Sequence, residues 1–241
     1  MAPHILTVSG IIGSGKTTVC REIAQITGWR IVSAGTILRK MAEESGLSVL
    51  AFNQLAKQDA SIDQKIDDSL RALNDAAEPL VVDSRLAWHF IRKSYRIHLV
   101  VDQGIAAQRV FTAHRTDETY ATAAAAYQAN VDRQRAENER FRQYYGVDCD
   151  LWTNYDLVLD SGTLAPRALA ETALAAHAQY LQGPACMLDP QRLELEEPPG
   201  DSSTFPPRLK VEGERLRIVG GADHVLAART RQEPLVDCRL A

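Results

Sequence analysis

Ten residues near the start of the chain have the types and spacing of a phosphate-binding loop. Residues 10–19 read Gly-Ile-Ile-Gly-Ser-Gly-Lys-Thr-Thr-Val and match the pattern G-x-x-x-x-G-K-[ST]. Glycines let the backbone wrap a phosphate without Cβ clashes, and the N–H groups and the helix dipole supply positive potential. In this motif Lys16 reaches the β- and γ-phosphates and the Thr17 hydroxyl ligates Mg²⁺. We therefore expect ATP to bind through Gly10, Gly13, Ser14, Gly15, Lys16, Thr17 and Thr18.

The residues around this loop supply the strand and the helix that it needs. Residues 5–8 form an apolar run typical of a buried strand, and apolar residues recur at helical spacing over 16–27. Further apolar runs alternate with helical patterns as far as a closing helix near 166–181, and they lie at 30–33, 79–83, 97–102 and 157–160. We predict an α/β fold, a P-loop NTPase whose five-stranded parallel sheet is flanked by helices.

Composition and charge narrow the function classes. A chain of 241 residues with 45% hydrophobic and 24% charged residues fits one soluble α/β domain with a small appendage. Its formal net charge of −4 gives no general attraction to nucleic acid, and no apolar run reaches membrane-spanning length. The cysteines are far apart and form no C-x-x-C pair, so we expect reduced thiols and a cytoplasmic location.

Two clusters that follow strands are candidates for binding a second ligand. Asp83 ends an apolar run, where a partner of Mg²⁺ belongs, and Arg85 just beyond it could clamp an acceptor phosphate with two hydrogen bonds. Ser33 ends another run, and Arg39 comes early enough in the next helix to point back into the cleft. The alternatives are a cap or turn role for Asp83 and a solvated surface role for Arg39.

A third cluster lies in an Arg-rich, Ala-rich helical stretch over residues 105–145. Arg133, Glu137 and Arg140 stand at i, i+4 and i+7, which places all three on one helical face. Phosphoryl transfer spreads negative charge over equatorial oxygens, and closing arginines neutralise that charge while excluding water. A solvated ladder of salt bridges is the alternative interpretation of the same face.

Together these pieces resemble the nucleoside monophosphate kinases, most closely the archaeal-type branch of the cytidylate kinase family. The resemblance covers about residues 4–182, and its segments are collinear at 9–18, 32–39, 62–67, 83–88, 133–141, 145–148 and 155–158. It implies a kinase that uses ATP and Mg²⁺ to phosphorylate CMP or dCMP. It also implies a helical monophosphate-binding insert at about 35–76 and a lid at about 115–146.

The resemblance also assigns roles to single residues. It implies that the acceptor nucleotide is held by Ser33, Arg39, Asp83, Arg85, Arg133, Glu137 and Arg140. Lys16, Arg133 and Arg140 would be catalytic, Thr17 and Asp83 would hold the metal, and Arg115 would contact the donor phosphates. No strong general base is required, because positioning and charge neutralisation carry the rate.

Departures from the family pattern leave the acceptor open. Ser84 stands where the family usually has Gly, and Trp88 and His89 stand where it often has another Gly. A kinase of the same fold that acts on a specialised metabolite, such as an antibiotic or a modified nucleotide, is therefore one alternative. A nucleotide-dependent regulatory or DNA-associated protein is the second.

The last part of the chain changes composition. Residues 183–207 are rich in proline and acidic residues, which predicts a linker or an irregular wrap. Residues 208–241 predict a small α+β module, for which a start near 185 is the alternative boundary. Such a module is too small for a robust core of its own, so we expect it to pack on the kinase domain or on a partner.

This module weakly resembles the small domain shared by chromosome-partitioning proteins, sulfiredoxin and free-serine kinases. The similar segments are 187–193 and 216–228. Active members of that fold have Gly-x-His-Arg where this chain has Gly221-Ala-Asp-His224, so the resemblance carries over no catalytic role. A protein or ligand contact and simple packing both remain open uses for the module.

Overall fold

The computed structural model describes residues 2–47, 52, 55, 60–113, 120–179, 185–196 and 204–241. These residues form a sheet of ten strands in the order β2-β3-β1-β4-β5-β6-β10-β8-β9-β7. The strands are β1 (Ile5–Gly10), β2 (Arg30–Ser33), β3 (Leu80–Asp83), β4 (Tyr95–Val100), β5 (Leu157–Asp160), β6 (Ala185–Leu188), β7 (Leu193–Leu195), β8 (Arg208–Glu212), β9 (Arg215–Gly220) and β10 (Val236–Leu240).

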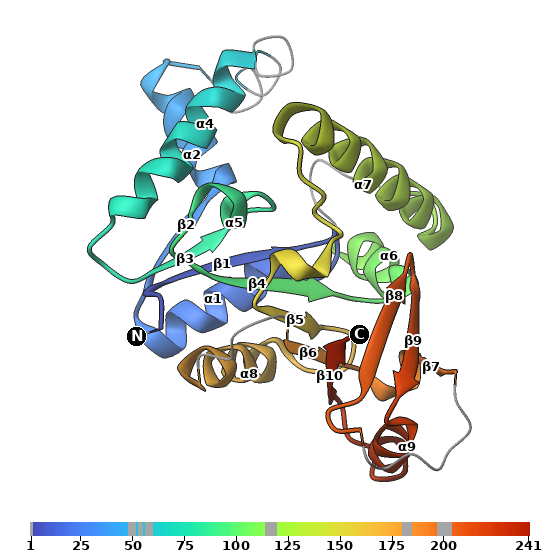
Figure 1. The fold of residues 1–241 in the computed structure, drawn as a ribbon. Helices are drawn as coiled ribbons and strands as arrows, with labels where there is room; N and C mark the ends of the chain where they lie inside the picture. The colour runs from blue at the N-terminus through green and yellow to red at the C-terminus, as the bar shows by residue number, and fades with distance from the viewer. Residues whose placement is uncertain are drawn as a thin grey trace.

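Helices cover this sheet and extend beyond it (Figure 1). They are α1 (Lys16–Thr27), α2 (Ala34–Glu44), α4 (Ala60–Ala72), α5 (Ala87–Phe90), α6 (Gln103–Thr112), α7 (Ala123–Tyr145), α8 (Pro166–Gln179) and α9 (Ala222–Thr230). Short 3₁₀ turns occur at Leu73–Asp75, Trp152–Asn154 and Pro190–Arg192. Helices α1 and α8 pack side by side against the sheet, whereas α2, α4 and α7 stand above one end of it (Figure 1). Within the described ranges, no helix is long and apolar enough to cross a membrane.

The first five strands of the order form the predicted parallel sheet. Strands β2, β3, β1, β4 and β5 pair in parallel, so the α/β prediction is confirmed. Strands β1 and β5 are buried throughout, as expected for strands covered by helices on both faces. The register places Asp83 beside Ser33 of β2 and beside Val8 of β1, so the clusters predicted at strand ends lie together at one edge.

The C-terminal part continues the same sheet. Strand β6 pairs in parallel with β5, β10 pairs antiparallel with β6, and the β8–β9 hairpin joins through β10. Buried side chains of the hairpin belong to one apolar cluster with residues of the N-terminal part, among them Phe90 and Tyr155. The expected hairpin, the short helix α9 and the final strand are all present.

Two expected segments differ from the structure. Strands β6 and β7 lie inside residues 183–207, which we expected to be a linker or an irregular wrap, and β6 begins at the alternative boundary near 185. The apolar run Ala185–Leu188 becomes a strand because β5 and β10 hydrogen-bond to its two edges. The helical stretch 105–145 contains two helices, α6 and α7, and Thr122 caps the second by accepting a hydrogen bond from the N–H of Ala125.

Candidate functional site

The loop between β1 and α1 has the shape that the phosphate-binding motif requires. Gly13 and Gly15 have φ values of 82° and 83°, which favour glycine. A Cβ atom on Gly13 would also lie 2.5 Å from the carbonyl oxygen of Ala106. The Lys16 ammonium folds back over the loop and donates hydrogen bonds to the carbonyl oxygens of Gly10, at 2.7 Å, and Ile11, at 3.0 Å.

The protein lowers the pKa of Lys16 to about 8. Burial of the ammonium is the largest cause, and the neighbouring positive charge of Arg85 adds to it. The carboxylates of Asp83 and Glu137 oppose both effects. The loop therefore holds a cation whose charge is disfavoured, and polyphosphate oxygens bound there would stabilise it.

Thr17 and Asp83 lie in direct contact. The Thr17 hydroxyl donates a 2.6 Å hydrogen bond to Oδ2 of Asp83, which the register of β3 places beside the loop. A hydroxyl and a carboxylate oxygen are ligands of the kind that Mg²⁺ accepts alongside substrate phosphates. These two residues therefore fit the metal site that the sequence predicts.

A cavity of about 600 Å³ opens from the phosphate-binding loop toward α2, α4 and α7. Twelve of the predicted site residues line it: Gly13, Gly15, Lys16, Thr17, Thr18, Ser33, Arg39, Asp83, Arg85, Arg133, Glu137 and Arg140. Ser14 is buried in the loop, where its hydroxyl donates to the carbonyl of Ile11. Arg115 lies outside the described residues.

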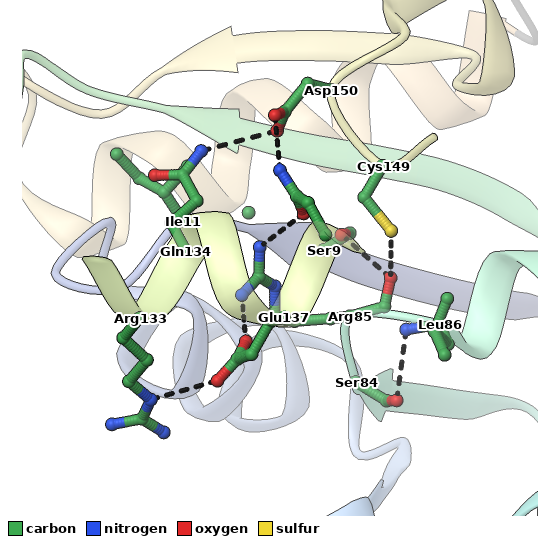
Figure 2. A network of polar contacts seen from close by, with 12 residues as sticks. Ser9, Ile11, Ser84, Arg85, Leu86, Arg133, Gln134, Glu137, Cys149 and Asp150 are labelled. Atoms are coloured by element: carbon green, nitrogen blue, oxygen red, sulfur yellow. Dashed lines mark hydrogen bonds and ion pairs between the residues drawn. The ribbon is translucent and has the colours of Figure 1, made fainter. Parts of the chain in front are cut away.

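Arg85 is held in place by helix α7 (Figure 2). Its guanidinium, whose side chain is 15% exposed, forms an ion pair with Glu137, and Glu137 also accepts a 2.9 Å hydrogen bond from Nε of Arg133. Burial disfavours the charged form of Glu137, but the positive charges of Arg85 and Arg133 outweigh it and lower the pKa. The predicted face of α7 is therefore a charge network that faces the cavity.

The predicted residues of α2 and α7 reach the cavity in different ways. Ser33 is the N-cap of α2, where its hydroxyl accepts a 3.0 Å hydrogen bond from the N–H of Thr36. The Arg39 guanidinium lies close to Gly35. A Cβ atom added to Gly35 would be 4.0 Å from Nη1 of Arg39. Arg140 lies 3.8 Å from Asp63 of α4, so a guanidinium–carboxylate pair spans the cavity.

The acidic face of α4 also contributes to the cavity, although it was not among the predicted site residues. Asp63 and Asp67 line the cavity together with Tyr145 of α7. Asp67 is 8% exposed and shares a hydrogen bond with the Tyr145 hydroxyl, while burial raises its pKa. The available signal was the i, i+4 spacing of the two carboxylates, which puts both on one helical face.

A second missed residue is Arg109 of α6. It donates a 2.8 Å hydrogen bond to the carbonyl of Ser161 and lines a cavity of about 370 Å³ together with Gly13, Thr18 and Pro166. A guanidinium beside the phosphate-binding loop can stack on a flat ring. No local pattern distinguishes this arginine from its helical neighbours, so only the packing identifies it.

The sequence matches the cytidylate kinase-like family over residues 5–163. The cytidylate kinase of Natronomonas pharaonis is 34% identical over 179 residues, covering 72% of this chain and 91% of that protein. That of Methanothermobacter thermautotrophicus is 34% identical over 158 residues, covering 65% and 94%. A similar segment occurs in the S-adenosylmethionine-dependent nucleotide dehydratase of Lacinutrix mariniflava, which is 34% identical over 69% of this chain, but the match spans only 34% of that protein.

Solved structures share the fold. The shikimate kinase of Acinetobacter baumannii superposes with a TM-score of 0.52 at 15% identity, covering 75% of this chain and 95% of that one. An uncharacterized protein from Eubacterium ventriosum gives a TM-score of 0.56 at 13% identity, covering 72% and 98%. These likenesses establish the P-loop kinase architecture, and the sequence matches are more specific. The chain belongs to the cytidylate kinase-like family.

Proposed function

We propose that this protein transfers the γ-phosphoryl group of ATP to CMP or dCMP. The observation that carries the proposal is the single cavity that runs from Lys16 of the phosphate-binding loop to the carboxylates of Asp63 and Asp67. One end supplies cations for phosphates and the other supplies hydrogen-bond acceptors. A nucleoside monophosphate has the complementary arrangement, with an anionic phosphate at one end and a base at the other.

The phosphate end suits two phosphate groups that repel each other. Lys16, Arg39 and Arg85 line the cavity, and Arg133 and Arg140 of α7 line it as well. Their positive charge offsets the repulsion and the charge that develops in the transition state. Mg²⁺, held by Thr17 and Asp83 with the phosphates, would supply further charge neutralisation. The chain's own contribution is to position both nucleotides and exclude water.

The base end favours cytosine. Carboxylates accept hydrogen bonds, and the exocyclic amino group of cytosine donates them, whereas uracil presents a carbonyl oxygen in that place. Asp63 and Asp67 would therefore accept from cytosine and repel uracil. Arg109 and the cavity beside Ser161 would receive the adenine ring of ATP.

Of the departures that favoured a specialised metabolite, Trp88 lies outside the cavity and Ser84 lines it. Trp88 is 6% exposed and packs edge-on against Tyr155 at 5.4 Å, in the core and not among the cavity-lining residues. Ser84 lines the cavity, and its hydroxyl accepts a long hydrogen bond of 3.4 Å from the N–H of Leu86. The acceptor end therefore keeps room for a nucleotide. A cytoplasmic location stays part of this proposal.

The regulatory or DNA-associated alternative has little support in the charges of the module. Arg215 pairs with Glu194 at 2.7 Å, and Arg217 pairs with Glu196 at 2.6 Å. Cations that are paired within the protein release fewer counterions from nucleic acid.

Steady-state assays of ADP release test the proposal with CMP, dCMP, UMP, AMP and GMP as acceptors. We expect the highest kcat/KM with CMP or dCMP, and no transfer by the Lys16→Ala variant. Asp67→Asn should narrow the preference for CMP over UMP by about tenfold to a hundredfold, because each base-specific pair contributes roughly 1–3 kcal/mol. Asp68→Asn is the matched control on the same helix, since Asp68 is 62% exposed and lies outside the cavity. A higher kcat/KM with another acceptor would overturn the assignment.

A further inference from the structure

A second large cavity shares helix α7 with the nucleotide cavity and is lined in part by the C-terminal module. Its volume is about 580 Å³, within the range of small-molecule pockets. Helix α7 lines both cavities, but with different faces: Glu137 faces the nucleotide cavity, whereas Gln134 and Asn138 face this one. The β8–β9 hairpin, which rises beside α6 in Figure 1, forms the remaining wall with Val211 and Leu216.

The wall formed by the hairpin lies outside the part of the chain that matches the family. The match to the cytidylate kinase-like family ends at residue 163, whereas the hairpin spans 208–220. The nucleotide cavity is lined entirely by residues within the family match. The second cavity therefore requires a segment that the kinase reaction proposed above does not.

One residue that lines this cavity carries a buried nitrogen atom without a hydrogen-bond partner among the described residues. His98 lines the cavity and is 3% exposed, and its Nδ1 has no hydrogen-bond partner among the described residues. Burial, helped by the positive charges of Lys16 and Arg85, lowers the pKa of His98 to about 3, so the ring is neutral near pH 7. Leaving such a nitrogen unpaired is costly, and a ligand with a polar ring atom would remove the cost.

The remaining lining indicates the chemistry of the ligand. The charged residues that line the cavity are Arg135, Arg142, Arg192, Asp102, Asp150 and Glu214. Arg142 is paired with Asp148 and Arg192 with Asp160, so these two cations are already neutralised within the protein. A molecule without net charge therefore suits the cavity better than an anion. The apolar surfaces of Trp152, Val100 and Leu216 suit a flat ring, and the amides of Gln134 and Asn138 suit its polar edge.

Hydrogen bonds connect the two cavities. Asn138 donates to Oδ2 of Asp150 at 2.5 Å and accepts from Nη2 of Arg85 at 3.4 Å, while Arg85 pairs with Glu137 in the nucleotide cavity. Gln134 also donates to Asp150, at 3.3 Å (Figure 2). A ligand that competes for Asp150 or Asn138 would alter how Arg85 is held.

We propose that this second cavity binds a neutral heteroaromatic compound of nucleoside size, and that its occupancy changes the affinity of the neighbouring site for the acceptor nucleotide. The coupling rests on the proposed function, because it assumes that Arg85 contacts the acceptor. The binding does not, since it can be measured without turnover.

Calorimetric titration with cytidine, uridine, adenosine and guanosine tests the binding. The titrations use protein saturated with CMP and a non-hydrolysable ATP analogue, so that nucleosides cannot fill the kinase site. We expect at least one of them to bind with a Kd of about 1 mM or tighter. Two variants should each weaken binding about tenfold or more. His98→Phe keeps the ring contact with Tyr155 but removes the ring nitrogens, and Gln134→Trp fills the cavity.

Gln128→Trp is the matched control, because Gln128 is exposed on the same helix and lies outside the cavity. It should bind the nucleoside like the unaltered protein. The same nucleoside should change KM for CMP in the unaltered protein and leave it unchanged in His98→Phe. By linkage, CMP should change the affinity for the nucleoside by the same factor. The site would be overturned if none of the four nucleosides bound. It would also be overturned if both cavity variants bound the nucleoside as tightly as the unaltered protein. Binding without any effect on CMP affinity would overturn the coupling.

Discussion

Replacing Lys16 by methionine should stabilise the ligand-free protein while abolishing phosphoryl transfer. The ammonium is buried among protein atoms, and a pKa of about 8 in place of 10.5 means that the fold disfavours its charge. Methionine is similar in length and uncharged, so it removes the buried charge without leaving a cavity. A residue that a binding site needs and the fold disfavours is expected to trade stability for activity.

The size of the effect follows from the pKa. A shift of this size corresponds to about 3 kcal/mol between the charged and neutral forms. Because the Lys16 residue is partly exposed, solvent screening reduces that figure to about 2 kcal/mol. Loss of the hydrogen bonds to Gly10 and Ile11 destabilises the variant by about 1 kcal/mol. The net gain of about 1 kcal/mol should raise Tm by roughly 2–4 °C in a protein of this size.

The pH dependence of the difference identifies its cause. The folded-state pKa of Lys16 lies below the unfolded value, so the folded protein releases this proton first and gains stability as the pH rises from about 8 to about 10.4. The advantage of Lys16→Met should therefore be full below pH 8 and be lost as the pH rises through that range, above which only the cost of the lost hydrogen bonds remains.

Thermal unfolding followed by circular dichroism at several pH values measures both effects. Lys40→Met is the matched control, because Lys40 has a side chain that is 76% exposed and only a loose ion pair with Glu44, so its replacement should leave Tm nearly unchanged. A lower Tm for Lys16→Met, or a difference between the two proteins that is constant with pH, would refute the reasoning.

Three further predictions concern the other charged groups. Arg39→Ala and Arg85→Ala should raise KM for CMP by about tenfold or more while ATP still binds, because each removes a charged hydrogen-bond donor from the acceptor cavity, and equilibrium dialysis with ATP separates the two effects. Unchanged acceptor kinetics in both would remove them from the site. Asp83→Asn should lower kcat and raise the Mg²⁺ concentration needed for half-maximal rate, since it replaces a carboxylate ligand by a neutral amide. A magnesium titration measures this concentration, and an unchanged value would contradict the prediction. Arg192→Met should destabilise the fold by about 3–5 kcal/mol, because it leaves the fully buried carboxylate of Asp160 without its ion pair. Urea unfolding measures the change in the free energy of unfolding, and a loss below about 1 kcal/mol would contradict the prediction.

The sequence predicts best where glycines mark the ends of elements. Helix α1 runs from Lys16 to Thr27 as expected, because Gly15 and Gly28 adopt left-handed φ values at its two ends. Strands β2 and β5 also match their predicted bounds, since each is a short apolar run between clear breaks. Strand β4 begins two residues earlier than predicted, at Tyr95, because pairing with Leu6 of β1 recruits residues that no local pattern marks.

The remainder depends on contacts between distant segments. Prolines on both sides of Ala185–Leu188 concealed a strand, because composition does not show that β5 and β10 would pair with it. The spacing of Arg133, Glu137 and Arg140 predicted a shared face but not that Glu137 would neutralise Arg85, which is 52 residues away. The site assignments as a whole stay predictions until the variants are measured.

The position of β10 in the sheet has a consequence for how the protein assembles. This strand lies between β6 and β8, so among the described strands its hydrogen bonds join the hairpin to the part of the sheet that carries the phosphate-binding loop. Until residues 236–240 are in place, β6 presents an open edge with unpaired amides and carbonyls, which is a template for adding foreign strands. Folding intermediates that lack this last pairing should therefore be the aggregation-prone ones.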